Sequence, residues 1–141
     1  MYKTKLNIVQ LEDGDFHTLI KASVMGQPIR VVVDTGASHS CMDTEFAKSI
    51  LPELHTEEHD GVTAGIGGDD FEVRIANIPD FRIGHFKQPF YDSMALIDFT
   101  YINQAYCRLH KEPIQMILGN DFLFEHKAVI DYKTECLFFE K

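Results

Sequence analysis

The pattern of hydrophobic and polar positions along the chain is mainly that of short β-strands separated by turns. Apolar and polar residues alternate over 5–11 and 16–24, and the turn-forming run Glu12 to Asp15 separates these two predicted strands. A turn at 25–28 then leads into a third predicted strand, which ends in the run Val31-Val32-Val33. Because three consecutive valines are apolar on both faces of a strand, this strand is expected to be buried.

The rest of the chain continues this β-rich pattern with a few helical segments. A short helix is predicted over 43–51 and ends before Pro52; a second is predicted over 101–110, and a helical turn over 119–124. Further strands are predicted, in chain order, at 62–64, 71–75, 81–90, 93–98, 114–118, 128–132 and 136–139. No linker, repeat or low-complexity segment divides the chain, so residues 1–141 are expected to form a single all-β domain.

The composition is that of an ordinary folded domain, and its charge excludes several classes of partner. Of the 141 residues, 45% are hydrophobic and 25% are charged, and 22 acidic against 13 basic residues give a net charge of −9. This charge predicts no nucleic-acid and no membrane partner, and neither a signal peptide nor a membrane span is predicted. Cys41, Cys107 and Cys136 match no zinc or disulfide framework, so we expect a reducing cytoplasm.

A carboxylate directly follows the valine strand, in the sequence Asp34-Thr35-Gly36-Ala37-Ser38. Burial penalises the ionised form of a carboxyl group, so Asp34 is expected either to be paired or to carry a raised pKa, as acid–base chemistry requires. Gly36 allows a sharp turn or the close approach of another backbone. The alternative is structural: Asp34 closes the strand in an Asx-type turn by accepting hydrogen bonds from the following amides.

A glycine-rich segment, Gly65-Ile66-Gly67-Gly68, lies at the tip of a predicted hairpin between the strands 62–64 and 71–75. Several glycines around one exposed isoleucine suit a mobile lid that closes over an extended ligand. The alternative is a long hairpin turn without a function.

Other candidate residues are better explained by structure than by chemistry. The sequence 55–59 has the His-x-x-Glu-His pattern of a zinc peptidase, but Pro52 before it and Asp60-Gly61 after it favour a solvated acidic loop over the required helix. Cys41 is expected to be a small packing residue, and Asp131 a hydrogen-bonded structural aspartate. The sequence therefore predicts no metal site.

Three motifs, taken together, resemble the single-domain, retropepsin-like aspartic proteases of the clan AA type. They are Asp34 to Ser38 after a hydrophobic strand, Gly65 to Gly68 about thirty residues later, and Ile117-Leu118-Gly119-Asn120-Asp121-Phe122-Leu123 near the end of the chain. The resemblance covers roughly 16–139 and implies a closed β-barrel with a flap hairpin and one or two short helices, in a cytoplasmic and bacterial member of the family. The stretch 91–113 is an addition that could cover or reshape a dimer surface.

The resemblance also implies a catalytic pair of aspartates, of which this chain supplies one. Two carboxylates a few Å apart cannot both ionise, so the pair holds one proton, and together they activate a water and polarise the scissile carbonyl. Because the chain contains a single Asp-Thr-Gly, the second carboxylate must come from a second copy. The resemblance therefore implies a homodimeric aspartic endopeptidase that hydrolyses a peptide or protein substrate between two Asp34 side chains.

Further roles follow from the same resemblance. The implied catalytic residues are Asp34, Thr35 and Gly36, and the implied substrate-binding residues are Ala37, Ser38, Gly65, Ile66 and Gly67. No metal or organic cofactor is implied, and Gly119 is expected behind the catalytic loop, where a side chain does not fit. The C-terminal run 137–139 is expected in the core rather than at an interface. The alternative function is a catalytically silent retropepsin-like module that binds an extended peptide or a protein partner.

Overall fold

A computed structural model of the chain describes residues 1–12, 14–53, 56–58 and 73–141. These residues form eleven strands and three helices. In chain order the elements are β1 (Tyr2–Lys5), β2 (Asn7–Gln10), β3 (Phe16–Val24), β4 (Gln27–Val33), β5 (Cys41–Asp43), α1 (Thr44–Ile50), β6 (Glu57–Glu58), β7 (Arg74–Ile83), β8 (Phe86–Ile97), α2 (Thr100–Arg108), β9 (Met116–Leu118), α3 (Asn120–Glu125), β10 (Val129–Asp131) and β11 (Cys136–Phe139).

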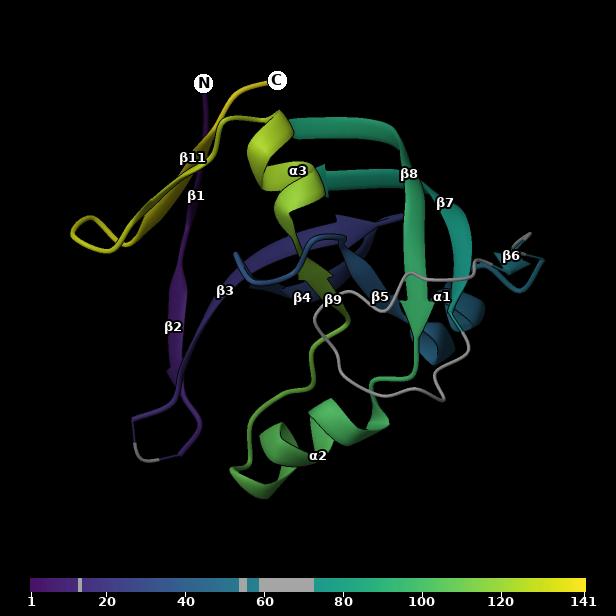
Figure 1. The fold of residues 1–141 in the computed structure, drawn as a ribbon, viewed down its shortest axis with the longest axis horizontal. Helices are drawn as coiled ribbons and strands as arrows, with labels where there is room; N and C mark the ends of the chain where they lie inside the picture. The colour runs from purple at the N-terminus through teal and green to yellow at the C-terminus, as the bar shows by residue number, and fades with distance from the viewer. Residues whose placement is uncertain (13, 54–55, 59–72) are drawn as a thin grey trace.

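Most of the strands form one curved sheet that closes on itself. The order of the larger sheet is β2-β3-β4-β9-β5-β8-β7-β6, and an additional pairing of β3 with β7 closes six strands into a barrel (Figure 1). The predicted closed β-barrel is therefore confirmed. The barrel carries three short helices rather than one or two, because the helical turn predicted after Gly119 extends to Glu125.

The two ends of the chain form a second, smaller sheet. Its order is β1-β11-β10, so the C-terminal strand lies between its own hairpin partner and the N-terminal strand. The first predicted strand is divided at Leu6, a buried residue whose N–H donates to the Glu135 carbonyl at 2.9 Å. Leu137 and Phe139 are buried, which confirms the core assignment of the C-terminal run.

Alternate residues of the central strands pack into two apolar clusters on opposite faces of the sheet. On β4, Val31 and Val33 belong to the larger cluster inside the barrel, whereas Val32 belongs to the smaller cluster on the other face. All three valines are buried, as their run in the sequence predicts. The strand that leads to Asp34 is thus held on both faces, which fixes the direction in which the chain leaves the sheet.

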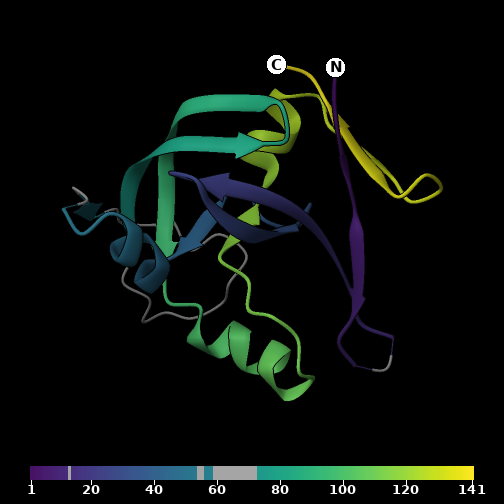
Figure 2. The same ribbon diagram turned by 180° about the vertical axis from the view of Figure 1, so that it is seen from behind.

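The additional stretch before β9 builds a cover for the smaller cluster. Phe99 and Tyr106, at the start and near the end of α2, are fully buried in this cluster together with Ile114 and Ile117. Both views of the fold place α2 at the opposite end of the molecule from α3 and the chain termini (Figure 1, Figure 2). Among the described residues, no helix is both long enough and apolar enough to cross a membrane.

Two expectations for the middle of the chain need correction. The strands predicted at 81–90 and 93–98 are instead one hairpin of β7 and β8, because the turn falls at Gly84, whose φ of 57° suits glycine. Glu57–Glu58, which the sequence predicts in a solvated acidic loop, instead pairs as a strand with β7, and this strand is also not the helix that the zinc motif requires. The predicted flap, with Gly65, Ile66 and Gly67, lies outside the described residues.

Candidate active site

The β4 strand delivers Asp34 to a loop at the edge of the barrel. The parallel pairing of β4 with β9 continues one residue beyond the strand, because the Asp34 N–H donates to the Leu118 carbonyl at 3.0 Å. The Asp34 side chain is half-buried in the single chain rather than buried, which corrects the expectation drawn from the valine run. Its carboxyl group therefore remains accessible to a substrate or to a second carboxyl group.

The residues after Asp34 turn sharply around its side chain. The Gly36 N–H donates to Asp34 Oδ1 at 2.8 Å, and the Ala37 N–H donates to the Asp34 carbonyl at 3.2 Å. The Asx-type turn considered as a structural alternative is therefore present, and it also aims the carboxyl group. Thr35, Gly36 and Ser38 are exposed, whereas the Ala37 side chain is buried.

Gly119, between β9 and α3, lies directly behind this loop, as the sequence motif predicts. A Cβ atom at this position would lie 2.8 Å from the Ala37 carbonyl oxygen and 2.9 Å from the His39 carbonyl carbon. Both neighbours are backbone atoms, so the loop could not accommodate a side chain without moving. The absence of a side chain at Gly119 thus lets the two segments pack in contact.

A polar network that sequence reasoning missed ties the end of the loop to α3 and β8. The buried Ser40 hydroxyl donates to Asp121 Oδ1 at 2.7 Å and accepts from the Gly119 N–H at 2.8 Å and the Tyr91 hydroxyl at 2.7 Å. The same Asp121 oxygen accepts from the N–H groups of Ser40 and Phe122, at 3.1 and 2.9 Å. Burial, with the charge of Asp121, raises the pKa of the Tyr91 hydroxyl far above its ordinary value.

Asn120 holds the front of the loop and was also missed. Its side-chain amide donates to the Thr35 carbonyl at 2.7 Å, and its backbone N–H donates to the Ala37 carbonyl at 2.8 Å. The sequence signal for these contacts is slight: two polar residues, Asn120 and Asp121, follow an apolar run where a helix begins. Only the fold shows that these two residues brace opposite sides of one loop.

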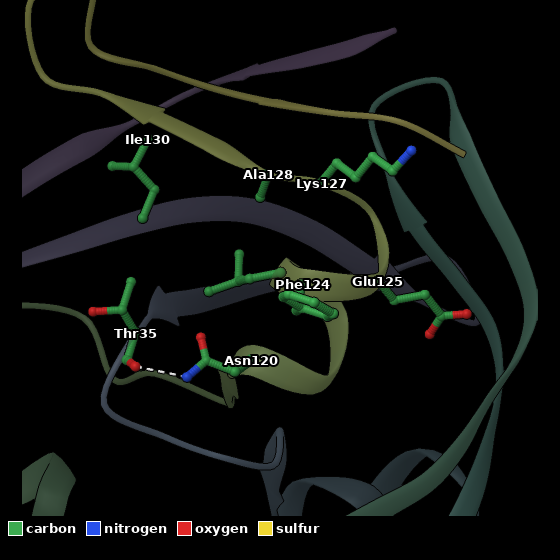
Figure 3. Close-up of a pocket in the computed structure, with 8 residues that line it drawn as sticks. Thr35, Asn120, Phe124, Glu125, Lys127, Ala128 and Ile130 are labelled. Atoms are coloured by element: carbon green, nitrogen blue, oxygen red, sulfur yellow. Dashed lines mark hydrogen bonds between the residues drawn. The ribbon is translucent and has the colours of Figure 1, made fainter.

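An open groove adjoins the exposed side of the loop. It has a volume of about 920 Å³ and is lined by Thr35, Asn120, Leu123, Phe124, Glu125, Lys127, Ala128 and Ile130. Figure 3 shows Asn120 joined to Thr35, with Ile130 of β10 across the groove. Phe124 is 88% exposed, which is unusual for so large an apolar side chain. None of the residues that line this groove comes from α2.

The other candidate residues have structural roles. Burial, together with the charges of Asp34 and Asp121, raises the pKa of the Cys41 thiol to about 12, so the thiol is inert. Asp131 Oδ1 accepts hydrogen bonds from the N–H groups of Lys133 and Thr134, and the bonds with Thr134 hold the pKa of Asp131 below its usual range. Within the described part of the chain, no three His, Cys, Asp or Glu side chains are grouped as metal ligands.

The sequence of the chain matches a known family. The family profile of aspartyl proteases covers residues 20–122, and the chain therefore belongs to the aspartyl protease family. Over 119 residues it is 29% identical to the DNA damage-inducible protein 1 of Kluyveromyces lactis, a match that covers 84% of this chain and 25% of that protein. The chain thus spans about a quarter of the length of this curated relative.

Two crystal structures are similar to the chain in fold. The retroviral protease-like domain of Ddi1 from Leishmania major superimposes with a TM-score of 0.58 and 20% identity, covering 87% of each chain. A retropepsin-like aspartic protease from Rickettsia conorii gives a TM-score of 0.53 and 21% identity, covering 98% of this chain and 88% of that one. At these identities the likeness concerns the fold, which is retropepsin-like.

Proposed function

We propose that the chain is a homodimeric aspartic endopeptidase that cleaves peptide bonds with a water held between two Asp34 carboxyl groups. The observation that carries this proposal is the Asp-Thr-Gly loop of an aspartyl protease family member, braced from behind while the Asp34 carboxyl group stays accessible. Thr35 and Gly36 complete the catalytic loop. Ala37 and Ser38, with Gly65, Ile66 and Gly67 of the predicted flap, are proposed to bind the substrate.

The chemistry requires one proton shared by the two carboxyl groups. The ionised Asp34 removes a proton from the water, whose oxygen attacks the scissile carbonyl carbon, while the partner's Asp34 donates its proton to the carbonyl oxygen. In the resulting gem-diol intermediate, Asp34 gives the proton it took from water to the peptide nitrogen, and one hydroxyl of the intermediate returns a proton to the partner's Asp34 as the bond between carbon and nitrogen breaks. The pair then again holds one proton, so the cycle consumes one water for each peptide bond.

The groove beside Thr35 supports a second copy as the partner. Phe124 exposes a large apolar surface there, and β10 is an edge strand of the terminal sheet with Val129 exposed. The opposite edge, β1, carries the exposed residues Lys3 and Lys5, which discourage pairing with another chain, whereas β10 carries no lysine. A second copy that covers the groove would also bring a second Asp34 toward the first.

A cytoplasmic location is part of the proposal. The cysteines Cys41, Cys107 and Cys136 all carry free thiols, which suits a reducing compartment. Peptide or protein substrates are the partners that the family implies, and the net charge of −9 disfavours nucleic acid.

Asp34→Asn tests the proposed chemistry. The variant should lose cleavage by about a thousandfold or more, because a neutral amide cannot take the proton from water. Its fold should persist with an unchanged or higher Tm, since the repulsion between two carboxyl groups disappears. Turnover of a peptide library from pH 3 to 8, together with thermal unfolding of both forms, measures these effects. A chelator should not change the activity of either form.

Two results would contradict the proposal. Cleavage retained by Asp34→Ala would exclude the aspartic mechanism. A wild-type chain that binds extended peptides but cleaves none of the library would instead support the silent binding module.

A further inference from the structure

The side chain of Asp121 is a carboxylate placed behind the catalytic loop. Three groups donate hydrogen bonds to its Oδ1, namely the Ser40 hydroxyl, the Ser40 N–H and the Phe122 N–H. The Tyr91 hydroxyl, which also bonds to Ser40, lies 3.2 Å from Oδ2. An ionised carboxylate accepts hydrogen bonds only, so this set of partners fits the charged form. Asp121 also lies in the first turn of α3, where the free N–H groups of a helix favour negative charge.

In the described part of the chain, this charge is not paired with a cation. Among those residues, no lysine or arginine forms a salt bridge with Asp121. The side chain is half-buried, so water screens its charge less than that of a surface residue. The field of Asp121 therefore reaches the groups packed around the loop.

The titratable groups around Asp121 are two side chains that stay neutral, one further carboxylate and two histidines. Cys41 on β5 and Tyr91 on β8 both have raised pKa values and stay neutral. Glu125, on the same helix, is exposed and adds negative charge, and the exposed His39 belongs to the loop itself. His126 follows α3, and its ring packs against Phe122 with the centroids 4.2 Å apart.

Asp34 and Asp121 lie on opposite sides of a short loop. Asp34 is joined to Leu118 by its backbone, and Ser40, at the other end of the loop, is joined to Asp121 by its side chain. The Cys41 thiol lies close enough to both carboxylates for the charge of each to act on it. Both carboxylates thus act on the same buried thiol, and the bonds of the loop place Asp121 three residues after the Leu118 carbonyl to which the Asp34 N–H donates.

We propose that the charge of Asp121 helps to set the pH range in which the paired Asp34 carboxyl groups share one proton, and so the pH range of cleavage. This inference rests on the proposed protease function. A negative charge behind the loop disfavours further ionisation of the pair, so the pair keeps its shared proton to higher pH. Asp121 is a positioning residue in this scheme, because it acts through the loop and the Asp34 pair.

Asp121→Asn tests the inference with little change in shape. The asparagine oxygen can accept the bonds from Ser40 and Phe122, and its amide can donate to the Tyr91 oxygen, so the network survives while the charge is lost. Both limbs of the pH profile of kcat/KM should move to lower pH by about 0.3 to 1 unit. The midpoint of the Asp34 carboxyl titration, followed by NMR, should move the same way.

Two variants separate charge from structure. Asp92→Asn removes a charge of the same kind at an exposed position of β8 next to Tyr91, and both limbs should stay where they are in the wild type. Tyr91→Phe removes a hydroxyl from the network but keeps the charge of Asp121. Both limbs of its pH profile should therefore stay at the wild-type pH, even if the maximum of kcat/KM is lower.

The outcomes are distinct. A downward shift of both limbs confined to Asp121→Asn supports the inference. Superimposed profiles for Asp121→Asn and wild type, or an equal shift in Tyr91→Phe, overturn it while the protease function stands. If Asp121→Asn does not fold, Asp121→Ser, which keeps a hydroxyl acceptor, takes its place with the same expected shift. The NMR midpoint decides the question without relying on cleavage, so a failure of the proposed function is recognised separately.

Discussion

The two sides of the loop from Asp34 to Ser40 are built in opposite ways. Behind the loop, the chain supplies the hydrogen-bond partners itself: Ser40, Tyr91 and Asp121 bond to one another, and Gly119 allows the backbones to touch. In front of the loop, the Asp34 carboxyl group is accessible, and a groove with an exposed Phe124 adjoins it.

This difference separates what one chain can do from what needs a second chain. At the rear of the loop, the polar groups of Ser40 and Asp121 have hydrogen-bond partners within the chain, and Phe122 packs against the rings of Phe86 and Phe139. The front of the loop exposes apolar surface and carries one of the two carboxyl groups that the catalytic pair requires. We therefore expect changes at the rear to affect folding stability, and changes at the front to affect dimerisation and activity.

Outside the catalytic aspartate itself, the largest effect is expected at the front, from Phe124→Asp. If a second copy covers the groove, an added charge there should weaken dimerisation at least about 30-fold, as the loss of an interface hot spot does. Cleavage at low protein concentration should fall with the dimer. The stability of the single chain should change little, because Phe124 is 88% exposed in it. Analytical ultracentrifugation and activity measured over a range of concentrations test this.

Tyr101→Asp is the matched control for this prediction. Tyr101 is also a large exposed side chain on a helix, at 83% exposure, but α2 lies at the other end of the molecule from the groove (Figure 1). Its substitution should leave the association constant unchanged. An equal loss of dimer in both variants, or no loss in Phe124→Asp, would show that the groove is not the dimer surface.

A smaller effect is expected at the rear, from Gly119→Ala. The backbone of Gly119 has φ −105° and ψ −169°, which any residue can adopt, so the penalty comes only from Cβ contacts with the backbone, at 2.8 Å from the Ala37 carbonyl oxygen and 2.9 Å from the His39 carbonyl carbon. We expect a loss of about 2–3 kcal/mol in the free energy of unfolding. Denaturant titration at a fixed protein concentration measures it.

Gly84→Ala is the control, because its penalty comes from backbone conformation and not from a steric clash. Gly84 has a φ of 57° and open space where a Cβ atom would lie, so alanine there meets no clash and costs about 1 kcal/mol through backbone conformation alone. A smaller loss in Gly119→Ala than in Gly84→Ala would mean that the loop moves away at little cost.

The same difference explains how much of the molecule the sequence could predict. The barrel strands and Asp34 follow from local patterns, since a run such as Val31 to Val33 identifies a buried strand without knowledge of its neighbours. The support of the loop does not, because its bonds join residues far apart in the sequence, such as Gly119 with Ser40, 79 positions apart, and Asn120 with Thr35, 85 positions apart. A polar residue gains such a role only when the chain has folded.

The hairpin of β7 and β8 shows a second reason why prediction from the sequence failed. The sequence favoured a break after Phe90, whereas the chain turns at Gly84 and β8 runs on to Ile97. A single glycine with a positive φ is enough for a tight hairpin. Near the predicted break, β8 has only an irregularity, a shift of the register with β7 and a φ of 58° at Ser93, after which the pairing with β7 continues. Tertiary pairing here outweighed the local turn propensity.

The smallest effect is expected from Ala37→Ser, at the boundary between the two sides. The Ala37 side chain is buried, while the backbone of Ala37 bonds to Asp34 and to Asn120. Ala37 has no hydroxyl group with which to bond the Asp34 carboxylate, so the catalytic pair lacks one stabilisation of its ionised form. Cleavage should therefore peak in the mildly acidic to near-neutral range. A serine hydroxyl that bonds the carboxylate should move the pH optimum downward by about one unit at most.

The pH–rate profiles of Ala37→Ser, Asp121→Asn and the double variant test whether the front and the rear of the loop act independently. The added hydroxyl at position 37 and the charge of Asp121 reach Asp34 by different routes, so the two displacements should add in the double variant. Superimposed profiles for Ala37→Ser and wild type would show that the hydroxyl does not reach the carboxylate, and the optimum would then depend on the charges around the loop, with His39 the first to test.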